Sequence, residues 1–481
     1  MSANTVGFAL LLIGVMMLIS KIIRVKWRLA QKLFIPSSII GGVIALLIGP
    51  DILGRIGSAL GADGLAEGGL FTPEILDVWK TLPGLLISLV FAGLFMGHRL
   101  PSPKEALRVA GPQISFGMTI ASGQYVVGLL LAILVLVPLF NVPVWTGTLI
   151  EIGFEGGHGT AAGMADTFAD FGFAEAQDLA LGLATVGILS GVIVGIALIN
   201  WGVRRGKTEI LRNDAKPTVA EQAGIVEKDR RRAAGTLTVQ PSSIETLTLH
   251  FGLLALGVLI GWLMLTGLQW IESKLWADSF ELFTYVPLFP IAMVGGIIVQ
   301  VAIQSFDRDE IVDQQLIERL QGFSLDVLVI AALGTLSLSA IASNIGPFLL
   351  LAGAGLAWTV GAFIFLAPRM LPNFWFERGI ADTGQALGVT STGLILLRVV
   401  DPNLETPAYS AFGYKQLLLE PFFGGGLITA GVIPIIANFG VGWVLGPMLV
   451  LFVASLSIGI LYFGRQRTTG QTLPRAEVPA G

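Results

Sequence analysis

The sequence predicts an all-α, polytopic membrane protein with two inverted repeats, each made of spanning helices and one re-entrant loop. Three observations predict this class: the composition, a series of apolar runs, and two apolar stretches interrupted by glycine and threonine. Of the 481 residues, 54% are hydrophobic and 13% are charged. Soluble domains carry about 25% charged residues. A chain of this composition cannot cover a water-facing surface.

The composition also excludes several functional classes. Lys and Arg number 29 against 33 Asp and Glu, a net charge of −4 that excludes a nucleic-acid binder. The absence of cysteine excludes disulfides, thiolate metal sites and cysteine nucleophiles. The three histidines form no metalloprotease pattern, and GVRRGKT at 202–208 lacks the first glycine of a phosphate-binding loop, because position 201 is Trp201. We therefore expect neither an enzyme nor a cofactor.

The apolar runs predict about 11 transmembrane helices. Each is near the roughly 20 residues that a helix needs to cross a bilayer. The runs lie at 6–23, 34–53, 83–97, 108–137, 179–200, 249–270, 284–303, 325–343, 345–367, 417–437 and 441–463. Basic residues follow the first run and no cleavage site of small residues does, so a retained helix is expected rather than a signal peptide.

Two further stretches, at about 146–165 and 379–397, are apolar on average but contain many Gly, Thr and acidic residues. They are poor spanning helices, and we predict that each enters the membrane and returns on the same side. Backbone without a complete helix is tolerated at membrane depth only where protein or a wet cavity satisfies its polar groups.

The charges of the loops predict the orientation, because cytoplasmic loops are rich in Lys and Arg. KIIRVKWRLAQK, which follows the first run, contains five basic residues and no acidic one, so the N-terminus is expected outside. With 146–165 as a re-entrant loop, the polar linker 203–248 and the tail 464–481 are cytoplasmic. Counting 146–165 as a full span would place the basic runs RRGK and KDRRR of the linker outside.

The linker separates two candidate repeats, 1–202 and 249–463. IPSSIIGG (35–42) and FPIAMVGG (289–296) both read Pro-x4-Gly-Gly in the second span of each half. An odd number of crossings in the first half makes the second half inverted. Proline and glycine are common in membrane helices, so this one pattern could arise by chance. Inverted repeats with broken helices in matching positions indicate the binding site of a secondary transporter.

The two broken segments predict one ligand site made from two loop tips. A helix that begins inside the membrane offers free N–H groups and a positive dipole end to an anion. The candidate substrate-binding residues are Gly156, Gly157, His158, Gly159, Thr160, Gly388, Thr390, Ser391 and Thr392. The candidate sodium-binding residues are Glu155, Asp382 and Gln385.

These residues also have simpler interpretations. The glycines could be packing points between helices, and His158 could only satisfy a backbone carbonyl. Glu155 and Asp382 could be solvated residues at the mouth of the site. Lys415 and Glu420 are expected at the start of the tenth span. A channel fits the composition as well, although opposed broken segments favour alternating access over a symmetric pore.

The motifs GGHGTAA, Pro-x4-Gly-Gly and ALGVTSTGL resemble those of the bacterial sodium/glutamate symporter family, in matching order over most of the chain. The resemblance implies two inverted repeats of five helices and a re-entrant loop each, elevator-like movement and a homodimer in the bacterial inner membrane. It implies sodium-coupled import of glutamate, with Na+ as the coupling ion. A carrier of another small organic anion is the alternative.

The resemblance also assigns residues to the two loops. Gly156 to Thr160 match the motif of the first loop, and Gly388, Thr390 and Thr392 match that of the second. The sequence departs from the family at Glu155, where a small residue is expected before the glycine pair. It also has a long central polar linker and an extra C-terminal span.

Overall fold

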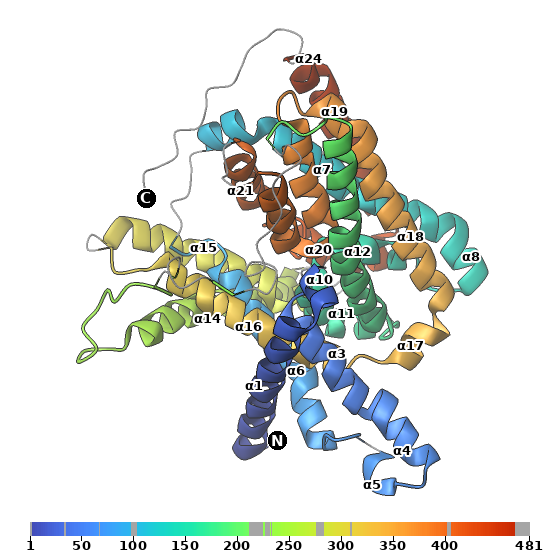
Figure 1. Cartoon of the computed structure of the whole chain (residues 1–481), viewed down its shortest axis with the longest axis vertical. Helices are drawn as coiled ribbons and strands as arrows, with labels where there is room; N and C mark the ends of the chain where they lie inside the picture. Colours follow the sequence, from blue (N-terminus) through green and yellow to red (C-terminus); the bar gives the residue numbers. More distant parts are fainter. Residues whose placement is uncertain are drawn as a thin grey trace. The chain divides into compact units, whose positions relative to one another are not determined.

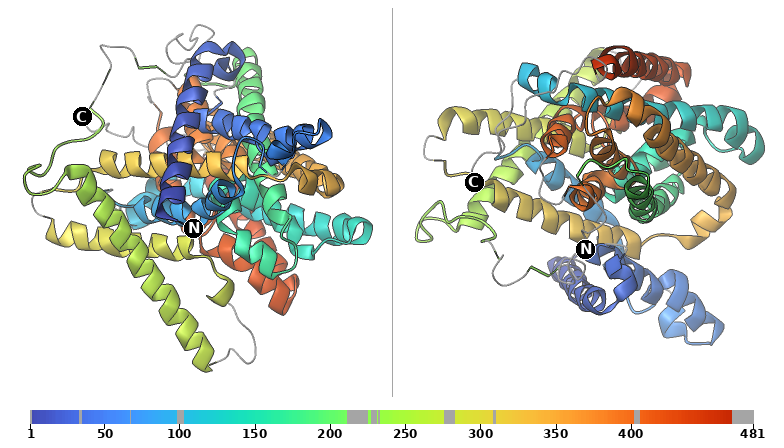
Figure 2. Two further views of the ribbon diagram at one scale, coloured as in Figure 1. Left: turned by 90° about the horizontal axis from the view of Figure 1, so that it is seen from below. Right: turned by 45° about the horizontal axis from the view of Figure 1, so that its top comes forward.

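The computed structural model describes residues 2–32, 35–66, 68–97, 103–210, 225–226, 231, 233–275, 283–307, 310–401 and 406–466. These residues are helical with connecting turns and contain no strand (Figures 1 and 2). Nine helices in the described chain are long and apolar enough to cross a membrane: Ala3–Lys26, Ser37–Ala59, Pro73–Gly93, Ala110–Phe140, Ala176–Arg204, Thr246–Leu275, Leu288–Phe306, Ile345–Met370 and Gly442–Gln466. The predicted all-α, multi-pass membrane class is confirmed.

The predicted span 325–343 is wrong as one continuous helix. The structure has α16 (Gln314–Gly334), a turn, and then the short helix α17 (Leu338–Ser343). The first N–H groups of a helix have no partner within it. At this turn the backbone N–H of Ser337 donates to the carboxylate of Asp178 at 2.8 Å, which stabilises the interruption.

The predicted span 417–437 is also wrong as one helix. It is divided between α21 (Ala408–Leu419) and α22 (Leu427–Phe439). Pro421 lacks the N–H that a continuing helix needs. Gly424 has φ +67°, in the left-handed region that glycine adopts without steric cost. The glycine-rich segment between the two helices therefore breaks the apolar run.

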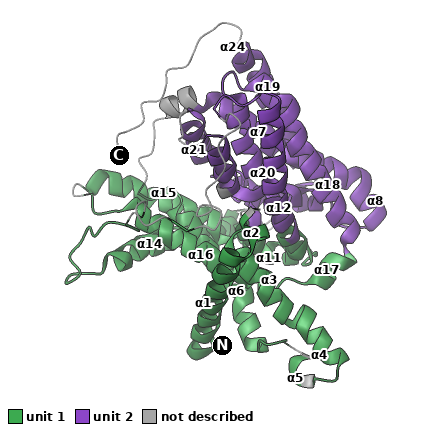
Figure 3. Ribbon diagram, in the orientation of Figure 1, with its two compact units in different colours: residues 1–100, 158–181, 218–343 green, residues 101–157, 182–217, 344–481 purple. Residues whose placement is uncertain are grey.

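The helices form two compact units, coloured separately in Figure 3. Unit 1 contains residues 1–100, 158–181 and 218–343, and unit 2 contains residues 101–157, 182–217 and 344–481. Each unit takes helices from both halves of the chain. The compact units are therefore not the two predicted repeats, whose assignment to 1–202 and 249–463 stays a prediction.

Unit 1 is a bundle in which α14 packs along α15, and α6 packs against both α15 and α16. The helix α3 packs against α1 and α16. Besides α16, the bounds of these helices are α1 (Ala3–Lys26), α3 (Ser37–Ile48), α6 (Pro73–Gly93), α14 (Thr246–Leu275) and α15 (Leu288–Phe306).

The two Pro-x4-Gly-Gly motifs make close helix contacts in unit 1. A Cβ on Gly42 of α3 would lie 2.6 Å from the Cβ of Leu333 in α16. A Cβ on Gly296 of α15 would lie 1.9 Å from the carbonyl oxygen of Ala92 in α6. Each glycine pair thus faces a helix from the other half of the chain, which is the small-residue packing typical of membrane helices.

Unit 2 is organised around α7, which packs against α18, α20, α21 and α23. The short helix α9 contacts α7, α18 and α20. Besides α21 and α22, the bounds are α7 (Pro103–Leu131), α9 (Leu149–Phe154), α18 (Ile345–Gly361), α20 (Trp375–Val400) and α23 (Gly442–Ile458).

Two stretches of unit 2 repeat the same elements at an interval of 230 residues. The π-helix η2 (Ala132–Leu136) is followed by α8 (Val137–Phe140), and the π-helix η6 (Ala362–Leu366) is followed by α19 (Ala367–Met370). The second residue of each four-residue helix is proline. This repetition indicates an internal relationship between the segments that precede the two predicted broken stretches.

Glycines of α12 (Ala176–Arg204) position α20. Gly187, Gly191 and Gly195 recur every fourth residue and therefore lie on one face of the helix. A Cβ on Gly187 would lie 2.1 Å from the carbonyl oxygen of Leu387, at the middle of α20. The backbone of α20 can come this close only because the facing positions carry no side chain.

Candidate functional site

The second predicted broken segment contains a helix break. Within α20, Gly388 has φ −148° and ψ 44°, and Val389 has φ 62° and ψ 172°. The conformation of Val389 is essentially restricted to glycine, and holding another residue there costs about 1–3 kcal/mol. Such strain is concentrated at functional sites, and here it falls inside the predicted stretch 379–397.

The first predicted broken segment is interrupted as well. The helix α9 ends at Phe154, and α10 (Gly157–Gly163) begins after a turn. Gly157 has φ +70°, and a Cβ built on it would lie 2.4 Å from Cγ1 of Val389. The glycine at the first break therefore leaves the space that the strained valine of the second break occupies.

The boundary between the compact units follows Gly157. Gly156 and Gly157 belong to unit 2, whereas His158, Gly159 and Thr160 belong to unit 1. His158 and Thr160 are buried, with 3% and 0% of their surface exposed. The proposed contact of these three residues with substrate stays a prediction.

The hydroxyl residues after the second break differ in their bonding. Thr390 is partly exposed, and its Oγ1 accepts a hydrogen bond of 2.6 Å from Nε2 of Gln416. Thr392 is buried, and its hydroxyl donates back to the carbonyl of Gly388. The side chain of Ser391 lies outside the described residues. Of the two hydroxyl side chains that the structure describes here, that of Thr390 is the more exposed.

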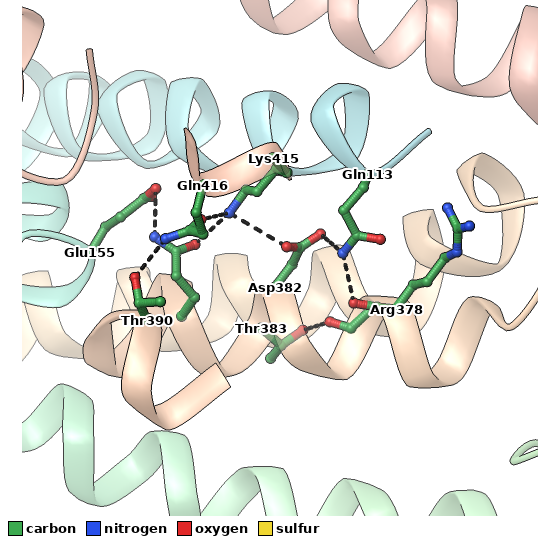
Figure 4. Close-up of polar contacts among 10 residues, drawn as sticks. Gln113, Glu155, Arg378, Asp382, Thr383, Thr390, Lys415 and Gln416 are labelled. Carbon is green, nitrogen blue, oxygen red and sulfur yellow. Dashed lines mark hydrogen bonds and ion pairs between the residues drawn. The ribbon is translucent and has the colours of Figure 1, made fainter. Parts of the chain in front are cut away.

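Lys415 of α21 lies at the centre of a buried polar network in unit 2 (Figure 4). Its ammonium donates to Oε1 of Gln385 at 2.9 Å and to Oε1 of Gln416 at 2.6 Å. It also forms an ion pair of 3.4 Å with Oδ1 of Asp382. The network joins α20, which carries Gln385 and Asp382, to α21.

Gln113 of α7 completes the environment of Asp382. Its Nε2 donates to Oδ2 of Asp382 at 2.7 Å and to the backbone carbonyl of Arg378 at 3.0 Å (Figure 4). The side chain of Arg378 is fully buried, and its Nε and Nη1 have no hydrogen-bond partner among the described residues. A buried cation with unsatisfied donors favours a nearby negative charge.

Glu155 joins the network from the first break. Its Oε1 accepts a hydrogen bond of 2.9 Å from Nε2 of Gln385. Its Oε2 is buried and has no hydrogen-bond partner in the part of the chain that the structure describes. The three residues predicted to bind sodium, Glu155, Asp382 and Gln385, therefore all take part in this network. Oε2 of Glu155 and Oδ1 of Asp382 accept no hydrogen bond from the described residues.

A second buried carboxylate, Glu151, lies one helical turn before Glu155. It accepts hydrogen bonds from the hydroxyl of Tyr125 at 2.6 Å, the hydroxyl of Thr429 at 2.8 Å and the backbone N–H of Gly424 at 2.6 Å. Gly424 lies in the segment that separates α21 from α22. Glu151 therefore connects α7, α9 and this third helix break.

Carboxyl groups outnumber cationic groups in this region. Glu420 is partly buried and within electrostatic range of Lys415 and Glu155. The four carboxyl groups are those of Glu151, Glu155, Asp382 and Glu420, and the two cationic side chains are Arg378 and Lys415. With all six ionised, the net charge is −2. Unpaired buried charge is costly, so the region is suited to bind cations.

Sequence reasoning missed several members of the network. Gln113 and Gln416 were not candidates, nor were Tyr125 and Glu151 of the neighbouring carboxylate site, and Lys415 was expected only at the start of a span. A signal existed for Lys415 and Glu151, because an ionisable residue inside an apolar segment is a functional candidate by default. The amide and hydroxyl residues carry no such signal.

Comparison with known proteins identifies a family and several bacterial relatives that this chain resembles. The model of a family described as sodium/glutamate symporter matches residues 109–373. The chain is 25% identical over 280 residues to the sodium/glutamate symporter of Haemophilus influenzae, and 24% identical over 269 residues to that of Escherichia coli K12. The first match covers 57% of this chain and 62% of the relative, and the second covers 54% and 60%. The chain thus spans about three fifths of the length of these relatives.

Proposed function

Because the chain belongs to the sodium/glutamate symporter family, we propose that it is a sodium-coupled symporter that imports glutamate by alternating access. The hydrogen bond between Glu155 and Gln385 is the observation that carries this proposal. It joins a carboxylate at one helix break to an amide three residues before the other break, and Oε2 of Glu155 has no hydrogen-bond partner among the residues that the structure describes. Broken helices that meet around buried polar groups are typical of the ion and substrate sites of transporters.

In this proposal sodium binds beside Glu155, Asp382 and Gln385. Hard cations prefer oxygen ligands, which carboxylates, amide oxygens and the carbonyls of interrupted helices supply. The excess of carboxyl groups supports this assignment, because a bound cation reduces the cost of the buried negative charge.

Glutamate binds against the residues that follow the two breaks. The family motif supports Gly156, Gly157, His158, Gly159 and Thr160 in the first segment and Gly388, Thr390, Ser391 and Thr392 in the second. The partial exposure of Thr390 supports a direct role for its hydroxyl. The guanidinium of Arg378 and the ammonium of Lys415 make the potential of unit 2 more favourable to an anion.

The transport cycle rests on the internal repeats. We propose that 1–202 and 249–463 are inverted repeats, supported by the reciprocal packing of the glycine pairs and by the 230-residue interval in unit 2. Elevator-like movement, a homodimer, and an inner-membrane location with the N-terminus outside and the C-terminus cytoplasmic belong to the same proposal.

Uptake by purified protein in liposomes tests the function. Labelled glutamate should accumulate when sodium is high outside, should not accumulate when choline replaces sodium, and should show counterflow. Glutamate uptake that is independent of sodium would contradict symport. Sodium-driven accumulation of another organic anion in place of glutamate would keep the mechanism and change the substrate. Single-channel current would contradict a carrier.

A further inference from the structure

Three side-chain oxygen atoms lie close to the Lys415 ammonium. Oε1 of Gln385, Oε1 of Gln416 and Oδ1 of Asp382 lie 2.9, 2.6 and 3.4 Å from Nζ. The ring of Phe412 lies 5.4 Å from the same atom. The side chain of Lys415 is fully buried. The two amide oxygens accept hydrogen bonds from the ammonium, and Oδ1 of Asp382 forms an ion pair with it.

The two amide oxygens are directed at the ammonium by other contacts. Nε2 of Gln385 donates to Glu155 at 2.9 Å, and Nε2 of Gln416 donates to Thr390 at 2.6 Å. Each amide therefore has its nitrogen held on one side and its oxygen turned toward Lys415. The second oxygen of Asp382 is likewise held, by Gln113. The three oxygens would keep this orientation toward any cation at the position of Nζ.

The side chain of Lys415 packs closely against Gly117 of α7. A Cβ on Gly117 of α7 would lie 2.3 Å from Cε and 3.3 Å from Nζ of Lys415. A Cβ at this position would force the lysine side chain to move. Together with the two hydrogen bonds and the ion pair with Asp382, this packing makes Lys415 a permanent part of the site and an unsuitable direct partner for a substrate carboxylate.

We propose that the Lys415 ammonium occupies a monovalent-cation site, as a covalently attached substitute for one sodium ion. One carboxylate and two amide oxygens, all fixed by second contacts, are the ligand types that a hard cation selects. The attached charge compensates Asp382 in every state of the transport cycle, which a dissociable ion cannot do. This inference rests on the proposed sodium coupling and concerns its stoichiometry. The wild-type protein should bind one sodium ion fewer than the same protein without the lysine.

Binding of radioactive sodium to the full-length protein, purified in detergent, tests the proposal. Lys415→Ala removes the ammonium and leaves the three oxygens facing an open space. We expect it to bind an additional sodium ion per protomer compared with the wild type. The sodium dependence of its glutamate uptake should also become steeper, with a Hill coefficient raised by about one. Lys415→Arg keeps the charge, serves as the matched control and should gain no sodium.

Lys415→Ser is a second variant, whose hydroxyl adds an oxygen to the site. Both neutral variants should gain thermal stability from sodium more than from choline, because a ligand stabilises the state that binds it. Equal sodium binding by wild type and Lys415→Ala contradicts the inference, and so does failure of both neutral variants to fold at high sodium. The proposed function is tested with the wild type alone. If the wild type shows no sodium-driven glutamate uptake, the proposed function fails, whereas this inference fails only through the sodium binding and folding of the variants.

Discussion

The side-chain amide of Gln385 donates a 2.9 Å hydrogen bond to Glu155, and the two residues are separated by 230 positions in the chain. The same interval separates the π-helices that begin at Ala132 and Ala362. In the proposed repeats, residues at equivalent positions would contact each other only close to the axis that relates the repeats. The shared interval of 230 residues is what the proposed repeats would produce if Glu155 and Gln385 were equivalent positions.

An exchange of the two side chains tests the pairing. Gln385→Glu places two carboxylates at hydrogen-bond distance and is expected to lower sodium-driven uptake by about tenfold or more, because like charges repel strongly in a buried site. The double variant Glu155→Gln/Gln385→Glu restores one carboxylate and one amide and should recover a large part of the uptake. Initial rates in liposomes measure both.

Glu155→Gln alone is the control for the lost charge. It keeps an acceptor for Gln385 and is expected to fold normally with a weaker apparent affinity for sodium. If the double variant is no more active than Gln385→Glu alone, the two positions do not act as a pair.

The hydrogen bonds of Glu151 to Tyr125 and to the segment between α21 and α22 give a prediction on stability. Tyr125→Phe removes the hydroxyl that donates to Glu151 at 2.6 Å and leaves a buried carboxylate with one donor fewer. The loss is expected to destabilise the protein by about 1–3 kcal/mol, because a buried acceptor loses a hydrogen-bond donor. Thermal unfolding in detergent should show a lower midpoint than for Tyr409→Phe, since Tyr409 is 42% exposed. Equal midpoints for the two variants would show that the hydroxyl of Tyr125 contributes nothing.

The sequence predicted the broken stretch of α20 because glycine and threonine are visible as interruptions of an apolar run. The break between α21 and α22 was missed although Pro421 and three consecutive glycines, Gly424 to Gly426, mark it. The flanking runs are so apolar that the mean hydropathy over the length of a spanning helix stays high across the interruption. The division of α16 and α17 was missed for another reason, since the acceptor Asp178 that stabilises the turn is remote in sequence.

The candidate site could be predicted only where its chemistry is local. Glu155, Asp382 and Gln385 were identified because they adjoin the glycine-rich motifs. Gln113 and Lys415 enter the site from α7 and α21, and only the tertiary packing brings them to Asp382. Contacts between residues that are hundreds of positions apart cannot be predicted from the local patterns of a single sequence.

The orientation of the chain is tested by labelling, because the protein contains no cysteine. A cysteine replacing Asp170, which precedes α12, is expected to react with a membrane-impermeant maleimide added outside. A cysteine replacing Lys26, at the end of α1, should react only after the membrane is opened. The basic segment after the first helix favours this arrangement. External labelling at position 26 would invert the assigned topology.

The contact between the two breaks gives the last prediction. Gly157 has φ +70°, and an added Cβ would lie 2.4 Å from Cγ1 of Val389. Gly157→Ala is therefore expected to abolish glutamate uptake while the protein still reaches the membrane, since both the backbone conformation and the space require glycine. Val389→Gly in the same chain removes the clash and should restore part of the uptake.

Gly172→Ala is the matched control for the backbone cost. Gly172 has φ +78°, and a Cβ there would meet nothing within 4 Å. The alanine thus carries the same conformational penalty, of roughly 1–2 kcal/mol, without the steric contact. Uptake near the wild-type level is expected for Gly172→Ala. If the two alanine variants lose uptake equally, positive φ alone accounts for the effect, and contact between the two helix breaks has no part in transport.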